Sequence, residues 1–502
     1  MSQLTSFTLA ECRDGLRKGD FSSVELTQAY IDAIRDAHVL NAFTIVTEDK
    51  ALHMAAEADR IFACKNSNAP DMCGIPLGIK DLFCTKGIAT QACSKMLDGF
   101  VAPYESTVTN KLWDQGAVML GKLNMDEFAM GASNTTSCNG NVISPWRSDT
   151  YNDEPLNPGG SSGGSSAAVS ARLCVAATGS DTGGSIRTPA AFTGIVGIKP
   201  TYGRCSRYGM IAFASSLDQA GVLARDVHDA SIMLRAISGH DPLDSTSADI
   251  AVPDYESTLH NGIQNKTIGI PMECMDEDMD DEVRNLWLQA IEWLKDAGAK
   301  ISHVSLANFR YSLPVYYVIA MAEASSNLAR YDGVRYGYRA PHKKGESIHE
   351  WYARSRSAGF GQEVKRRILI GTYVLSSGFY DAYYMRAQKI RKLIQADFKS
   401  VFDSGVDAML VPTALHEALP LKKLLNQDAI KNYRNDVFTV STNLAGLPAI
   451  SVPSGMSSNS LPLGLQLIGQ PWKEQELLNC AAILEKCANI TSCPSAWWKK
   501  SL

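Results

Sequence analysis

Several features that mark specialised classes of protein are absent from this sequence. Lysine and arginine total 48 against 53 acidic residues, so no excess of positive charge favours direct binding to nucleic acid. The twelve cysteines include no C-x-x-C pair and have no His-rich segment near them, which argues against a zinc site. Scattered thiols in a long chain are typical of a reducing compartment rather than of a disulfide framework.

The sequence also lacks a long apolar run. The opening segment, MSQLTSFTLAECRDGLRKGD, carries charges where a secretory signal would have its apolar core. Residues 437–472 carry no charge, but segments such as STN, AGLP and SSNSLP interrupt each apolar stretch, so a membrane-spanning helix is not expected. We therefore expect a cytoplasmic protein, with an organellar matrix as the alternative compartment.

Hydrophobic periodicity predicts alternating helices and strands. Ser22 to Val39 is predicted as a helix, because Ser22 and Glu25 form a capping box and apolar residues recur on one face. Helices are also predicted over Asp281 to Ala297 and over 471–487. Short strands are predicted at 74–81, 266–271, 300–306, 407–413, 448–453 and 462–469. This alternation indicates an α/β protein built around a largely buried sheet.

We interpret the 502 residues as one domain, because no segment is biased enough in composition to divide them and no repeat of 20–50 residues is evident. Within it we expect four regions: a helical segment over about 1–65, a Gly/Ser-rich core over about 66–240, an excursion over about 255–400, and a return to the sheet over about 405–502. Residues 330–348, rich in Tyr, Arg, Lys and Gly, are predicted to lie on the surface.

Two Gly/Ser-rich segments are the strongest candidates for chemistry. The first reads NPGGSSGGSS over 157–166, and small residues from Ala167 onward allow a helix to begin directly behind it. The second, DTGGSIR, places Ser185 behind two glycines. Glycines beside a serine let backbone N–H groups turn toward one point, as an oxyanion hole requires.

Two other interpretations of these segments compete with this one. Composition alone favours a flexible linker, but the helix and the second glycine turn that follow do not suit one. A phosphate-binding loop is disfavoured, because neither segment has the G-x-x-x-x-G-K-[ST] order and no lysine follows either. These patterns favour a catalytic serine over both alternatives.

A serine nucleophile needs a base, and residues 158–200 contain no histidine. A distant histidine stays possible, because catalytic triads assemble in space. In GIPLGIKD, Ile75, Leu77 and Ile79 alternate along a strand, which leaves Lys80 on the opposite face. Lys80 could act as a base if burial lowered its pKa by about 3 units. The alternative is a solvated lysine at the end of a strand.

The segments PGGSSGGSSAA, GSDTGGSIRTPAAFTGIVGIKPTYG and GIPLGIKD resemble the amidase signature family, serine hydrolases of carboxamides that use a Ser–cisSer–Lys triad. The resemblance spans nearly the whole chain and implies the family's large mixed sheet with helices on both faces. NMDEFAMG and SSGFYDAYY are similar to the branch of the family formed by the A subunits of Glu-tRNA(Gln)/Asp-tRNA(Asn) amidotransferases.

The resemblance implies a role for each matching residue. Ser185 corresponds to the nucleophile, Ser161 to the serine with the cis peptide bond, and Lys80 to the base. The implied oxyanion hole consists of the backbone N–H groups of Thr182, Gly183, Gly184 and Ser185. The implied glutamine ligands are Tyr316, Arg367 and Asp436, with the adjacent Tyr317 and Arg366 as alternatives to the first two.

The resemblance further implies a glutaminase subunit that supplies ammonia within a heterotrimer. The B and C subunits would be its partners, misacylated tRNA would bind mainly to the B subunit, and ATP and Mg²⁺ would be used there, with no cofactor in this chain. The alternatives are a stand-alone amidase acting on another carboxamide and a non-catalytic assembly protein. One departure is the loop 147–157, which is longer than expected for the family and polar, so it is predicted to lie in solvent.

Overall fold

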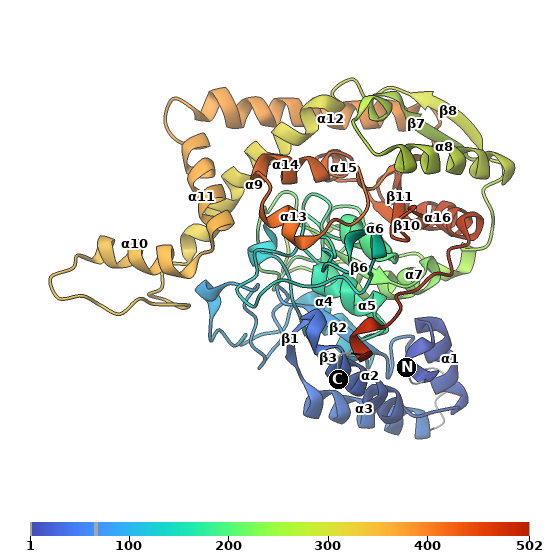
Figure 1. The fold of residues 1–502 in the computed structure, drawn as a ribbon, viewed down its shortest axis with the longest axis horizontal. Coiled ribbons are helices and arrows are strands. Elements are labelled where there is room, and N and C mark those ends of the chain that lie inside the picture. The colour runs from blue at the N-terminus through green and yellow to red at the C-terminus, as the bar shows by residue number, and fades with distance from the viewer. Residues whose placement is uncertain (1–2, 65–68, 501–502) are drawn as a thin grey trace.

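The structure, a computed structural model, describes residues 3–64 and 69–500, and its centre is one mixed sheet of eleven strands (Figure 1). The strand order is β1-β3-β2-β4-β6-β5-β10-β11-β9-β7-β8. The strands are β1 Phe43–Val46, β2 Pro76–Lys80, β3 Val118–Leu123, β4 Ala176–Ser180, β5 Val196–Lys199, β6 Ala220–Ala224, β7 Thr267–Pro271, β8 Lys300–Val304, β9 Ala408–Pro412, β10 Ala449–Met456 and β11 Pro462–Gly469. The predicted α/β class with a mixed sheet is confirmed.

The described residues form sixteen α-helices. Most of them lie around this sheet (Figure 1). The helices are α1 Leu9–Lys18, α2 Ser23–Asp36, α3 Glu48–Ala63, α4 Thr107–Asp114, α5 Gly163–Ser170, α6 Arg187–Thr193, α7 Val227–Ile237, α8 Asp281–Asp296, α9 Ser312–Asn327, α10 Ile348–Gly359, α11 Gln362–Val374, α12 Arg386–Asp403, α13 Leu421–Leu425, α14 Ala429–Tyr433, α15 Val440–Ala445 and α16 Glu474–Ala488. None of the described helices combines the length and apolarity needed to cross a membrane.

Strand β2 positions the candidate site. It is parallel to both of its neighbours, with Leu77 paired to Ala176 of β4 and Lys80 paired to Leu123 of β3. The carboxyl ends of parallel strands meet at the same edge of a sheet, which is where α/β proteins bind ligands. Lys80 is the last residue of β2, and the segment after β4 contains Asp181 and Ser185.

Local sequence signals account for the predicted elements. Ser22 accepts a hydrogen bond from the Glu25 N–H, and the Glu25 carboxylate accepts one from the Ser22 N–H, so the predicted capping box is confirmed at the start of α2. The helix ends at Asp36, three residues before the predicted boundary, because a 3-10 turn over His38–Leu40 follows. All six predicted strands are present as β2, β7, β8, β9, β10 and β11.

Three peripheral predictions have mixed outcomes. The surface segment 330–348 is confirmed as mostly exposed, and α10, which follows it, projects from the body (Figure 1). The stretch 255–400 is not wholly an excursion, because β7 and β8 form an edge of the same sheet. The loop 147–157 is exposed at 149–150 and 152–153 but anchored by Tyr151, whose hydroxyl donates to Glu417 at 2.6 Å, and by the buried Leu156.

The division of the domain into four regions stays a prediction. The first boundary, near residue 65, lies outside the described residues.

The twelve cysteines have free thiols, and most of these side chains are buried.

Candidate active site

Lys80 ends β2 with its side chain completely buried. Its Nζ lies 2.8 Å from the hydroxyl oxygens of Ser161, Ser162 and Ser180. The alternative of a solvated lysine at a strand end is therefore wrong. The ammonium or amine of Lys80 instead sits at the centre of three serine hydroxyls.

The surroundings of Lys80 favour a neutral amine. Burial lowers the pKa of Lys80 to about 7, because a charged ammonium loses its hydration there, and the carboxylates of Asp126 and Asp181 offset only part of this effect. The adjacent Asp81 carboxylate accepts the Cys93 N–H at 3.0 Å and so is engaged elsewhere. A lysine with a pKa near 7 can exchange a proton at physiological pH.

The serine loop before α5 supplies two of the hydroxyls around Lys80. Ser161 and Ser162 are both fully buried, and the peptide bond between Gly160 and Ser161 is cis, as the family resemblance implies. The helix α5 begins at Gly163, so its first turn directly follows these serines. Ser162 also donates from Oγ to the Ser180 carbonyl at 3.2 Å, which ties the loop to the end of β4.

Ser185 lies beside this loop, with 8% of its surface exposed, whereas Ser161 is fully buried. The Ser162 N–H donates to the Ser185 carbonyl at 3.2 Å, so the two serine segments are in contact. Within the described residues, no hydrogen bond joins the Ser185 hydroxyl to that of Ser161. Such catalytic contacts are often long without substrate and tighten when it binds.

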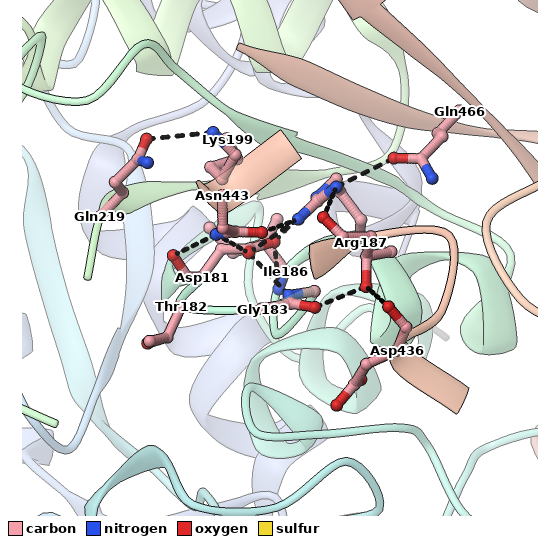
Figure 2. A network of polar contacts seen from close by, with 12 residues as sticks. Asp181, Thr182, Gly183, Ile186, Arg187, Lys199, Gln219, Asp436, Asn443 and Gln466 are labelled. Atoms are coloured by element: carbon pink, nitrogen blue, oxygen red, sulfur yellow. Dashed lines mark hydrogen bonds and ion pairs between the residues drawn. The ribbon is translucent and has the colours of Figure 1, made fainter. Parts of the chain in front are cut away.

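A buried ion pair holds the loop that carries Ser185. The Arg187 guanidinium donates from Nε and Nη2 to the Asp181 carboxylate, each bond 3.0 Å long, and neither side chain is exposed (Figure 2). Burial alone would raise the pKa of Asp181, but the Arg187 guanidinium brings that pKa below the usual aspartate range. The Asp181 carboxylate also accepts the backbone N–H of Gly184 at 2.8 Å and that of Ile186 at 3.2 Å.

The Arg187 guanidinium extends this network into the C-terminal part of the chain. Its Nη1 donates to the Gln466 side-chain oxygen at 2.9 Å, and its Nη2 donates to the Asn443 side-chain oxygen at 2.6 Å (Figure 2). The Asn443 side-chain nitrogen in turn donates a hydrogen bond of 2.9 Å to the Asp181 carboxylate. Asn443 and Gln466 lie 256 and 279 positions after Arg187 in the sequence, and buried hydrogen bonds join both to it. This network makes the loop rigid.

The implied oxyanion hole needs one correction. The Gly184 N–H is bonded to Asp181 and so cannot also serve as a free donor. Within the described residues, the N–H groups of Thr182, Gly183 and Ser185 donate to no acceptor, so these three remain available for a substrate oxygen. Gly184 has a φ of +139°, which residues with a side chain rarely adopt, and this conformation turns the loop.

The implied glutamine ligands lie on α9, on α11 and just before α15. Arg367 is buried and donates from Nε to Glu363 at 2.8 Å, whereas the alternative Arg366 is exposed. Of these two arginines, only Arg367 therefore faces the interior. Its guanidinium lies over the rings of Tyr317 and Tyr433, at 5.6 and 5.4 Å from their centroids.

The two candidate tyrosines have different neighbours. Tyr317 donates from its hydroxyl to the Asp436 carboxylate at 2.9 Å. Tyr316 packs against the loop that carries Ser185 so closely that a methyl group on Gly183 would lie 2.5 Å from its ring. Tyr317 thus contacts Asp436, and Tyr316 contacts the loop that carries Ser185. The Thr439 hydroxyl, which donates to the Gly183 carbonyl, connects the Asp436 segment to the same loop.

The Asp436 carboxyl has a pKa above the usual range for aspartate. Burial raises the pKa of Asp436 to about 7, although the Tyr317 hydroxyl and the Arg367 guanidinium both favour its charged form. A cation placed beside this carboxylate would stabilise the charged form further. The site therefore suits a ligand with a positive group near Asp436 and a negative group near Arg367.

Comparison with known proteins places this geometry in a family. The family model described as Amidase matches residues 25–478, which is most of the chain. The chain belongs to the amidase family.

Ser162 and Ser180, the two further hydroxyls around Lys80, were not singled out in the sequence, although Ser162 lies within the first glycine-rich segment and Ser180 directly precedes the second.

Close relatives of this amidase share nearly its full length. It is 60% identical over 498 residues to the A subunit of the glutamyl-tRNA(Gln) amidotransferase of Roseobacter denitrificans, covering 99% of this chain and 100% of that protein. It is 56% identical over 499 residues to the same subunit of Azorhizobium caulinodans, again covering 99% and 100%.

Solved structures agree with these relatives. The A subunit of the glutamyl-tRNA(Gln) amidotransferase of Thermotoga maritima superposes with a TM-score of 0.78 at 36% identity, covering 97% of this chain and 96% of that one. A peptide amidase from Stenotrophomonas maltophilia superposes with a TM-score of 0.80 at 30% identity, covering 98% and 99%. The fold therefore serves both a subunit of an assembly and other amide hydrolases.

Proposed function

We propose that this amidase is the glutamine-hydrolysing A subunit of a glutamyl-tRNA(Gln) amidotransferase. The observation that carries the proposal is a buried lysine with a pKa near 7 among serine hydroxyls, beside a loop with free backbone N–H groups, in a chain 60% identical to such subunits over its full length. Similarity of that extent favours this role over the alternative of a stand-alone amidase.

Acyl transfer follows from the arrangement. Neutral Lys80 accepts, through the Ser161 hydroxyl, the proton of Ser185 as the Ser185 oxygen bonds to the carbonyl carbon of the glutamine side chain. The oxyanion that forms is stabilised by the N–H groups of Thr182, Gly183 and Ser185. The proton then passes to the leaving nitrogen, the carbon–nitrogen bond breaks, and ammonia departs. Water hydrolyses the glutamyl ester and regenerates Ser185.

Glutamine is held by its charged ends. Arg367 pairs with the α-carboxylate, since a guanidinium can form two parallel hydrogen bonds with it. The Asp436 carboxylate pairs with the α-ammonium, and the Tyr317 hydroxyl orients that carboxylate. Tyr316 packs on the Gly183 side of the pocket and sets the position of the glutamine side chain.

Ammonia released here serves partner subunits. The relatives are themselves named as subunits of an amidotransferase. We place the B and C subunits beside this chain in a cytoplasmic heterotrimer, with misacylated Glu-tRNA(Gln), and in some organisms Asp-tRNA(Asn), on the B subunit. ATP and Mg²⁺ act there, and this chain needs no cofactor for the acyl transfer described above. A net charge of -5 agrees with a partner subunit, rather than this chain, binding the RNA.

Ammonia release separates this function from that of a stand-alone amidase. The chain is assayed with glutamine, asparagine and an unrelated amide such as benzamide, alone and with the B and C subunits. We expect glutamine to be preferred over asparagine by about 10-fold or more, because asparagine is one methylene shorter, and over benzamide by about 100-fold or more, because benzamide lacks the charged ends. Partner-independent turnover of benzamide at the glutamine rate would contradict the proposal.

The same assay predicts a dependence on pH. We expect kcat/KM for glutamine to rise as the pH increases through about 7, because Lys80 accepts a proton only when neutral and Asp436 holds the α-ammonium best when charged. Lowering the pH below the pKa of these groups protonates both and removes both contributions. Acylation of Ser185 by phenylmethylsulfonyl fluoride does not involve Asp436, so its pH profile isolates Lys80. A kcat/KM that falls with rising pH over this range would contradict the assignment.

A further inference from the structure

Two adjacent acidic residues, Asp126 and Glu127, are buried just after β3. Neither takes a step in the mechanism above, although the Asp126 carboxylate raises the pKa of Lys80. Asp126 has no exposed surface, and Glu127 is 2% exposed. Ionisable side chains are rarely buried in this way unless they are paired or hydrogen-bonded. Asp126 contacts the serine loop, and Glu127 contacts the start of α11.

Asp126 contacts the backbone on both sides of the cis peptide bond. Its N–H donates to the Ser161 carbonyl at 3.2 Å, and a methyl group on Gly160 would lie only 2.1 Å from its Oδ2. The carboxylate is itself held by the Asn134 N–H at 2.9 Å and by the Thr136 hydroxyl at 2.8 Å. Asp126 therefore fixes the position of Ser161.

Glu127 contacts the start of α11. Its two carboxylate oxygens accept the Gly361 N–H at 3.1 and 2.9 Å, across 234 positions of sequence, and Oε1 also accepts the Ser94 hydroxyl at 2.5 Å. Gly361 is the N-cap residue of α11 and has no side chain with which to cap it. A methyl group there would lie 2.3 Å from Glu127 Oε2, so glycine leaves room for this carboxylate.

A carboxylate in this position stabilises a helix in two ways. It satisfies a backbone N–H that has no partner within the helix, and in its ionised form it places a negative charge at the positive end of the helix dipole. Burial raises the pKa of Glu127 to about 7, so the hydrogen bonds contribute in both forms and the charge contributes mainly above that pH. The helix that Glu127 caps carries Arg367. The location of the Arg367 guanidinium therefore depends on where Glu127 holds the first turn of α11.

We propose that the Asp126–Glu127 dipeptide is a positioning element that couples the two halves of the site. Asp126 determines the position of Ser161, and Glu127 determines the position of Arg367 through its contact with the start of α11. Because the residues are adjacent, the distance between the reacting serines and the anchor of the α-carboxylate is held by one short segment of backbone. This inference rests on the proposed function, since it takes Arg367 as the carboxylate anchor.

The two residues are expected to control different kinetic constants. Loss of the Glu127 contact lets α11 shift, which weakens binding of the α-carboxylate and raises KM. Loss of a carboxylate contact with Asn134 or Thr136 lets the Asp126 backbone shift together with the Ser161 carbonyl that its N–H holds, which slows proton transfer and lowers kcat. Misplacement by about 1 Å is enough to cost up to about 100-fold in such sites.

The experiment compares Glu127→Ala, Glu127→Gln and Asp126→Asn in the assembled heterotrimer. Glutamine kcat and KM are measured, together with the rate at which phenylmethylsulfonyl fluoride acylates Ser185, since this reagent has no α-carboxylate. For Glu127→Ala we expect a KM raised about tenfold, with Ser185 labelling within about twofold of wild type. Glu127→Gln, which can still accept a hydrogen bond, is expected to recover part of the KM.

Asp126→Asn is expected to lower kcat and Ser185 labelling together by about tenfold or more, because an amide nitrogen cannot accept a hydrogen bond and so one of the Asn134 and Thr136 contacts is lost. Glu485→Ala is the matched control. The Glu485 carboxylate accepts the Val227 N–H at 3.0 Å at the start of α7, a helix that carries none of the proposed site residues. Its loss is expected to lower the melting temperature without changing KM.

Two results would overturn the inference. One is an unchanged KM in Glu127→Ala, and the other is a loss of Ser185 labelling in that variant as large as its loss of kcat/KM. Failure of the proposed function has a different signature, because the wild-type complex would then release no ammonia from glutamine.

Discussion

Glutamine hydrolysis by the Lys80→Ala variant is expected to fall by about 10⁴-fold, the upper range for removal of a general base. Lys80 is the group that receives the Ser185 proton in the proposed mechanism, and among the described residues its amine is the basic group that contacts Ser161. The fold is expected to survive, because the substitution removes a group that is neutral for much of the time at pH 7 rather than half of an ion pair.

Labelling and a second lysine make this prediction specific. Phenylmethylsulfonyl fluoride should label Ser185 rapidly in the wild type but not in Lys80→Ala, and Ser185→Ala should lose both labelling and turnover. Lys122→Met is the control, because Lys122 is also fully buried, on the neighbouring strand β3, and donates to Thr85 and Thr90 rather than to the candidate triad. Rapid labelling of Ser185 in Lys80→Ala would refute the role of the lysine.

Replacing Arg187 by methionine is expected to lower the free energy of unfolding by about 3–5 kcal/mol. The change leaves the Asp181 carboxylate buried with no cation beside it, and removes donors from Gln466 and Asn443. Asp181 also holds the Gly184 and Ile186 N–H groups, so the loop bearing Ser185 should loosen. Denaturant titration of the purified chain measures the loss.

Two comparisons test whether the uncompensated charge is the cause. The double variant Asp181→Asn/Arg187→Met removes both charges and should recover part of the lost stability. Lys399→Ala breaks a solvent-exposed ion pair with Asp403 on α12 and should change stability much less. A loss below about 1 kcal/mol in Arg187→Met would show that the pair does not organise the loop.

Periodicity predicted six strands and missed β1, β3, β4, β5 and β6. The capping box of Ser22 and Glu25 and the alternation around Lys80 are local patterns, and both predicted the correct element. The strands β4, AATGS, and β6, AGVLA, were not predicted, because small residues give little contrast between faces. Strand β3, VMLGKL, includes a buried lysine and a glycine that obscured its pattern.

The amides of the second glycine turn show a similar limit. Residue types predicted a loop with donors near Ser185, and the family resemblance named four of them. Which amides are free depends on Asp181, whose carboxylate turns back onto Gly184 and Ile186. That contact depends in turn on Arg187 and Asn443, which no local pattern connects.

By itself the sequence determined which reactive groups are present: Ser161 and Ser185 in glycine-rich segments, Lys80 at the end of a predicted strand, and no histidine between the two segments. It also carried the family resemblance across the chain. Only the tertiary structure decided that Lys80 is buried against Ser161, Ser162 and Ser180, which lie 81, 82 and 100 positions away. The reason is that a pKa is set by desolvation and by neighbouring charges, and strand pairing brings those neighbours together from distant parts of the chain.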